Sequence, residues 1–180
     1  MADVSGHDLG ASFITSSLKT LIRQNAGPLD GPSDTLRTMN GVLHTVLAPG
    51  QHLSAAYLTL ARPSGRIRLA LAGHPAPLLV SPGGQTVWLE AEGDLLGAFP
   101  SVHFDVLDLR ANPGDRIYLY TDGLIERPGS GREPGMVELA AQCARMADQP
   151  LDDALGAITE AMSQKGRKPE DDIVLLGIEV

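Results

Sequence analysis

Cysteine, aromatic residues, positive charge and long apolar runs are all scarce in this sequence. Its 180 residues include one Cys, which excludes an intrachain disulfide framework and a multi-Cys zinc site and is typical of a reducing cytoplasm. Seven aromatic residues are too few for a base-stacking platform, and 14 Lys plus Arg against 22 Asp plus Glu, a net charge of -8, argue against a nucleic-acid surface. No apolar run reaches the roughly 18 residues of a membrane span. We therefore expect a cytoplasmic protein whose partners are neither nucleic acid nor a membrane.

The remaining composition is that of an ordinary globular protein. Hydrophobic residues make up 43% and charged residues 20%, which suits one domain over residues 1–180. Helical spacing of apolar residues predicts helices over 9–24, 33–47, 136–147 and 151–164. Strands are expected at 53–61, 66–72, 77–81, 85–90, 102–109, 115–121 and 173–180, with a loop at 127–135. Tight turns between successive strands favour antiparallel pairing, so the expected fold class is α+β, an antiparallel β-sandwich flanked by helices.

Acidic residues recur at the ends of these elements. Asp122, in Thr-Asp-Gly, follows the strand at 115–121. Asp171 and Asp172 precede the closing strand, and Asp3 lies near the start of the chain. If these carboxylates converge, their mutual repulsion requires cations, and ligands that are all oxygen select Mg²⁺ or Mn²⁺ over zinc. The pattern therefore indicates a site for a hard divalent cation.

Four segments stand in an order that is typical of one family. They are residues 3–7 (Asp-Val-Ser-Gly-His), 72–77 (Ala-Gly-His-Pro-Ala-Pro), 113–126 (Pro-Gly-Asp-Arg-Ile-Tyr-Leu-Tyr-Thr-Asp-Gly-Leu-Ile-Glu) and 171–173 (Asp-Asp-Ile). With these segments the chain resembles, over essentially its whole length, the bacterial PPM-type metal-dependent serine/threonine protein phosphatases of the SpoIIE/RsbU branch. The resemblance implies a PPM phosphatase-like fold, and hydrolysis of phosphoserine or phosphothreonine on a regulatory protein in bacterial signalling.

The same resemblance implies a site with two ions, either Mn²⁺ or Mg²⁺. Asp3 would bridge both ions, and the backbone carbonyl of Val4 would reach one of them. Asp122 would bind the second ion together with Asp171, for which Asp172 is the less favoured substitute. Asp3 and Asp122 are thus the predicted catalytic residues. A water activated by the ions would attack the phosphorus directly, so no Cys or Ser nucleophile is needed.

The chain also departs from the family pattern. Strands and an acidic Gly-Asp-x-x-Asp motif normally precede the position of Asp3, which here lies almost at residue 1. We therefore expect an N-terminally truncated domain, which is a fragment of a longer protein, an incorrectly started reading frame or a naturally shortened member. Without its first strands it would expose an edge strand, so it should self-associate, for example as a homodimer, or be less active than a version extended upstream. Asp8 stands where a Gly is more frequent, and would cap the helix that follows.

Each candidate also has an ordinary structural interpretation. Asp122 could be only a turn residue, and Asp3 only part of a terminal tail. His7 could act as a general acid or only pack beside a helix, and Glu126 could orient a water or be a surface acid. Arg127 and Arg132 could hold a phosphopeptide. His74 is expected to be structural, and Cys143 is expected to lie in the core.

The resemblance also bears on partners. In this branch the substrate is often a phosphorylated anti-sigma-factor antagonist, and the catalytic domain is often fused to an upstream sensor or receiver domain. A catalytically silent PPM-fold binding module is the alternative, favoured by the missing acidic motif and disfavoured by Asp3, Asp122 and Asp171. A nucleotide hydrolase is a third interpretation, but no Gly-x-x-x-x-Gly-Lys-Ser/Thr loop is present.

Overall fold

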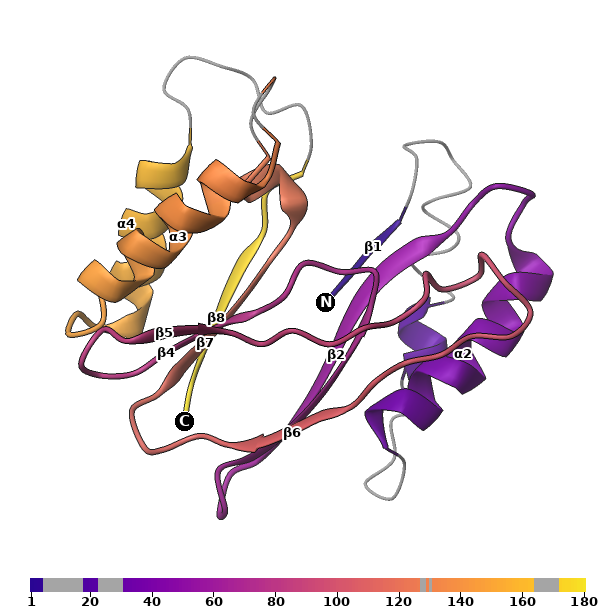
Figure 1. Ribbon diagram of the computed structural model, residues 1–180, viewed down its shortest axis with the longest axis horizontal. Helices are drawn as coiled ribbons and strands as arrows, with labels where there is room; N and C mark the ends of the chain where they lie inside the picture. Colours follow the sequence, from indigo (N-terminus) through magenta and orange to yellow (C-terminus); the bar gives the residue numbers. More distant parts are fainter. Residues whose placement is uncertain (5–17, 23–30, 127–128, 130, 164–171) are drawn as a thin grey trace. The chain divides into compact units, whose positions relative to one another are not determined.

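The chain folds into two compact units, which are described here one at a time. The computed structural model describes residues 1–4, 18–22, 31–126, 129, 131–163 and 172–180. One unit comprises Met1–His74 and Glu90–Arg110, and the other comprises Pro75–Leu89 and Ala111–Val180. Each unit contains one four-stranded antiparallel sheet, whose strands can be followed in Figure 1.

The sheet of the first unit is built around a long hairpin. Its strands, in spatial order, are β1 (Ala2–Val4), β2 (Leu53–Ala61), β3 (Arg66–Ala72) and β6 (Leu107–Arg110). The hairpin between β2 and β3 turns at Gly65, whose φ of 64° lies in the left-handed region that glycine adopts without strain. Both strands have the bounds that their alternating sequence predicts.

Helix α2 (Pro32–Val46) covers this sheet. Leu36, Met39 and Leu43 recur at helical spacing on one face and are almost fully buried, in one core cluster with Leu53 of β2. Pro32 occupies the first turn, where its missing N–H costs nothing. The predicted helix over 33–47 is thus confirmed. Of the predicted helix over 9–24, residues 18–22 are helical and the others lie outside the described residues.

The sheet of the second unit has a fully buried strand near its centre. The spatial order is β5 (Thr86–Trp88), β4 (Leu78–Val80), β7 (Arg116–Tyr120) and β8 (Leu175–Glu179). All five residues of β7 are buried. This strand leads into a short 3₁₀ helix, η1 (Asp122–Leu124), so the buried strand ends at the predicted metal ligand Asp122.

Two helices cover the second sheet. They are α3 (Glu133–Arg145) and α4 (Leu151–Met162), and their buried residues share a core with β4 and β7. Cys143 on α3 is completely buried, as predicted, and burial raises the pKa of its thiol to about 12. Strand β8 lies against α4, where Gly177 leaves room for Leu151 and Leu155.

The structure corrects two of the predicted boundaries and adds one strand. The added strand is β1, which was not predicted because three residues are too few for an alternating pattern to emerge. The strand expected at 102–109 is reduced to β6, with Phe104 forming only an isolated bridge to Gly93. Helix α3 begins at Glu133, inside the loop expected at 127–135, because Pro134 is compatible with the first helical turn.

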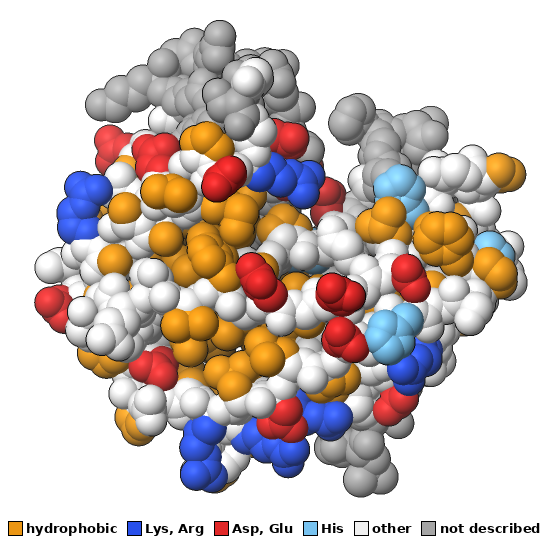
Figure 2. Space-filling model, in the orientation of Figure 1, with side chains coloured by type: hydrophobic (Ala, Val, Ile, Leu, Met, Phe, Trp, Pro, Cys, Tyr) orange, Lys and Arg blue, Asp and Glu red, His pale blue; other side chains and the backbone are white. Residues whose placement is uncertain are grey.

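The α+β class, with antiparallel sheets and flanking helices, is confirmed. Among the described residues, no helix has both the length and the apolar character needed to cross a membrane. On the face drawn in Figure 2, the Lys and Arg side chains of the described residues stand in small separate groups beside Asp and Glu, not in one continuous patch.

Candidate metal-binding site

Asp122 is held at the end of β7 by a tight turn. Its backbone oxygen accepts hydrogen bonds from the backbone N–H of Ile125 at 2.9 Å and of Glu126 at 2.8 Å. Two residues earlier, the Tyr120 hydroxyl donates to the carbonyl of Ala76 at 3.0 Å, and burial raises the pKa of that hydroxyl. The Asp122 carboxylate therefore projects from a backbone that is fixed on both sides.

The two oxygens of the Asp122 carboxylate have different surroundings. Oδ2 accepts a hydrogen bond from Nη2 of Arg132 at 2.7 Å, whereas Oδ1 is buried and has no hydrogen-bond partner. The side chain as a whole is 21% exposed. A buried carboxylate oxygen without a partner is costly unless a cation or a donor satisfies it. This orphaned oxygen fits a hard divalent cation, as the sequence predicts.

Thr121 brings the closing acidic segment to the same end of β7. Its backbone N–H donates to the carbonyl of Val174 at 3.1 Å, and its hydroxyl accepts from the N–H of Val174 at 2.9 Å. The hydroxyl also donates to the backbone oxygen of Asp172 at 2.8 Å. The backbone of Asp172 therefore reaches Thr121, the residue next to Asp122. Asp171 itself lies outside the described residues, so its role as a ligand stays a prediction.

Asp3 and Val4 lie in β1, at the edge of the first sheet. Asp3 pairs with Ser54 and Val4 pairs with Leu53 of β2. The amino group of Met1 donates to the carbonyl of Ala56 at 2.9 Å, and burial lowers the pKa of that amino group. Asp3 is therefore part of a strand and not of a terminal tail. It belongs to the first unit and Asp122 to the second, and their common metal site stays a prediction.

Ser54 is a neighbour of Asp3 that the sequence did not reveal. As the antiparallel partner of Asp3, it places its side chain on the same face of the sheet. Its hydroxyl lies 3.0 Å from Nδ1 of His74, which is buried, as expected of a structural histidine. No local signal could have shown this grouping, because it depends on strand register between segments about 50 residues apart.

The remaining candidates are placed as follows. Glu126 is exposed, and its Oε1 lies 4.0 Å from Nε of Arg132. His7, Asp8 and Arg127 lie outside the described residues. Among the residues that the structure describes, no group of three or more His, Cys, Asp or Glu side chains is arranged to hold a metal ion.

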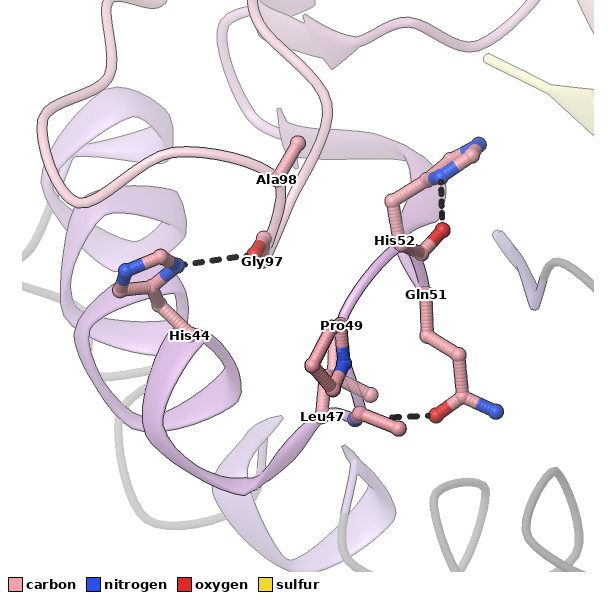
Figure 3. A pocket seen from close by; sticks show the side chains of 9 residues that line it. His44, Leu47, Pro49, Gln51, His52, Gly97 and Ala98 are labelled. Atoms are coloured by element: carbon pink, nitrogen blue, oxygen red, sulfur yellow. Dashed lines mark hydrogen bonds between the residues drawn. The ribbon is translucent and has the colours of Figure 1, made fainter.

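The first unit also contains a cavity of about 370 Å³ beside the end of α2 (Figure 3). Nδ1 of His44 lies 3.0 Å from the carbonyl of Gly97, and the side chain of Gln51 accepts from the N–H of Ala48 at 3.2 Å. None of the predicted metal ligands lines this cavity. Its polar side chains bind neighbouring backbone groups, so they organise the loop that follows α2.

Comparisons with known proteins agree with the motifs. The model of the family described as Stage II sporulation protein E (SpoIIE) matches residues 1–180. The phosphoserine phosphatase RsbP of Bacillus subtilis (strain 168) is 27% identical over 132 residues, which cover 71% of this chain and 33% of that protein. This chain thus spans about a third of the length of that curated relative.

Solved structures show the same fold. The structure of the RsbU and RsbW domains of Rv1364c from Mycobacterium tuberculosis has a TM-score of 0.85 and 30% identity, covering 99% of this chain and 50% of that one. The SiaA-PP2C domain of Pseudomonas aeruginosa also has a TM-score of 0.85, at 20% identity, covering 99% of this chain and 74% of that one. The resemblance predicted from the motifs is confirmed.

Proposed function

Because the chain belongs to the SpoIIE family, we propose that it is a protein serine/threonine phosphatase that acts in bacterial signalling. Its substrate would be phosphoserine or phosphothreonine on a regulatory protein, in line with the name of the relative RsbP. One observation of this structure carries the proposal. The Asp122 carboxylate ends a buried strand and keeps one buried oxygen without a partner, as a metal ligand of a phosphatase would.

Two Mn²⁺ or Mg²⁺ ions are the proposed cofactors. Asp122 and Asp171 would hold one ion, and Asp3 would bridge it to a second ion that the Val4 carbonyl also reaches. The bound ions would lower the pKa of a shared water and stabilise charge on the phosphoryl oxygens. The protein's own contribution is to hold these ligands in position. Thr121 contributes by tying the closing acidic segment to the end of β7.

What is typical of the family supports a proposal for the partners, the assembly and the location of the domain. We propose a phosphorylated anti-sigma-factor antagonist as the substrate, and an upstream sensor or receiver domain as the source of control. A homodimer is the proposed assembly. The cytoplasm stays the proposed location, with which the buried free thiol of Cys143 is consistent.

A catalytically silent binding module is the second candidate. The observation that favours it is the contact of Arg132 with Asp122, because a guanidinium there already neutralises the proposed ligand. The two candidates differ in one measurement, the hydrolysis of a phosphoserine peptide by the 180-residue protein with Mn²⁺, Mg²⁺ or a chelator. A phosphatase releases phosphate only with metal, whereas the silent module releases none under any condition. Phosphate release that persists in the chelator would contradict the metal-dependent mechanism.

We also propose that residues 1–180 are a catalytic domain that assembles as the homodimer. Sedimentation of the 180-residue protein, together with its turnover of a phosphoserine peptide, tests both parts of this proposal. Turnover by a strictly monomeric protein would contradict the homodimer. A dimer without turnover in Mn²⁺ or Mg²⁺ would contradict the catalytic role.

A further inference from the structure

Arg132 places one guanidinium between two carboxylates. Its Nη2 donates to Oδ2 of Asp122 at 2.7 Å, and its Nε lies 4.0 Å from Oε1 of Glu126. Hydrogen bonds between charged groups of this kind are about twice as strong as neutral ones. Arg132 therefore supplies a positive charge directly beside the proposed metal ligand.

Backbone contacts keep Arg132 close to Asp122, although the two are ten residues apart in sequence. The carbonyl of Arg132 accepts from the N–H of Met136 at 3.0 Å, which anchors it to the first turn of α3. In that turn, Gly135 packs so closely on Ile125 that a Cβ would overlap the Ile125 carbonyl oxygen. Ile125 in turn donates to the Asp122 backbone. The start of α3 is thus fixed against the turn that carries Asp122.

The side chain of Arg132 is more exposed to solvent than the carboxylate that it contacts. It is 48% exposed, against 21% for Asp122. Glu126 is 53% exposed and offers a second anchor at the same place. An arginine that moves from Asp122 towards Glu126 would stay beside the site.

We propose that Arg132 is an exchangeable counter-ion of Asp122. It neutralises the carboxylate while Asp122 holds no cation, and it turns to the phosphoryl group of the substrate when Asp122 takes a metal ion. This inference rests on the proposed function. A guanidinium and a divalent cation repel each other when both face one carboxylate, whereas the planar guanidinium matches two oxygens of a phosphate. Arg132 therefore weakens metal binding and strengthens phosphate binding.

The experiment separates these two opposite effects. Arg132→Met and Arg132→Lys are compared with a control, Arg145→Met. The control removes an exposed arginine from the last turn of α3, the helix that Arg132 precedes. Calorimetric titration with Mn²⁺ alone measures metal affinity. Inhibition of the Mn²⁺-loaded protein by inorganic phosphate then measures anion affinity, and thermal melting confirms that each variant is folded.

Arg132→Met should bind Mn²⁺ about 2–5-fold more tightly, which is the strength of a partly exposed ion pair. It should bind phosphate roughly tenfold more weakly, which is the loss of one charged hydrogen bond. Arg132→Lys keeps the positive charge but loses the planar guanidinium, so its changes in Mn²⁺ affinity and in phosphate affinity should both be smaller. Arg145→Met should change neither affinity. A structural role alone would not move the two affinities in opposite directions.

Other results would overturn the inference, and they show whether the proposed function fails with it. If Asp122→Asn abolishes Mn²⁺ binding but Arg132→Met leaves Mn²⁺ affinity at the wild-type value or lowers it, Arg132 is no counter-ion and the proposed function stands. The same conclusion follows if phosphate affinity is unchanged in Arg132→Met. If the wild-type protein binds no Mn²⁺, or Asp122→Asn binds it equally well, the metal site and the inference fail together.

Discussion

The two acids predicted to carry the chemistry, Asp122 and Asp3, are supported very differently by their strands. Asp122 follows β7, whose five residues are all buried and which has a neighbouring strand on each side. Asp3 lies in β1, which has three residues and, among the described strands, one neighbour, β2. A ligand that follows a central strand is positioned by the core, whereas a ligand in an edge strand depends on a few hydrogen bonds. The second unit thus offers the more rigid half of the proposed site.

The largest effect should come from removing one charge at each position. Asp122→Asn should cut turnover at least about 100-fold, more than the loss of a residue that only orients a ligand. The free energy of unfolding should change by no more than about 1 kcal/mol, the value of a partly exposed ion pair. Phosphopeptide kinetics measure the turnover, and urea unfolding measures the stability. The control is Asp148→Asn, which removes the same charge from an exposed position.

Asp3→Asn tests the other half of the comparison. If Asp3 bridges two ions, the turnover of Asp3→Asn should fall in the same assay by a factor similar to that of Asp122→Asn. A normal rate in Asp3→Asn together with an inactive Asp122→Asn would confine the metal site to the second unit. A normal rate in both variants would remove these acids from the chemistry altogether.

A smaller effect should follow from disturbing how Asp122 is held. Gly135→Ala would place a Cβ on the Ile125 carbonyl oxygen, so it should destabilise the protein by about 1–3 kcal/mol and move α3 away from η1. Gly156 on α4 has no atom within 4 Å of an added Cβ, and Gly156→Ala should stabilise by about 0.5–1 kcal/mol. Urea unfolding of both variants measures the difference. Equal stabilities would show that the approach of α3 to Ile125 is relaxed in solution.

The smallest effect is expected beside Asp3. Ser54→Ala removes the hydroxyl that contacts the buried His74, which should cost about 1 kcal/mol of stability. Because Ser54 is the cross-strand partner of Asp3, turnover should also fall a few-fold, whereas the exposed Ser101→Ala should affect neither quantity. A loss of stability with unchanged kcat would mean that the contact only supports the sheet.

Local sequence was enough to predict an element where that element has its own hydrophobic periodicity or its own turn. The strands at 53–61 and 66–72 and helix α2 were predictable, since alternation and helical spacing reflect which face of an element is buried. The acid after β7 was predictable too, because a carboxylate beside glycine at a strand end is a local arrangement. The motif from 113 to 126 identified the family without any knowledge of contacts.

Which residues surround those acids depends on the folded structure. β1 has no signal of its own, since three residues acquire strand geometry only through pairing with β2, and the same register places Ser54 beside Asp3. The contact of Arg132 with Asp122 depends on the close packing of Gly135 against Ile125, which composition and spacing do not encode. Local patterns in the sequence thus specify the elements and the candidate ligands, because burial patterns and turns are local. The neighbours of those ligands depend on non-local contacts, which exist only once the chain has folded.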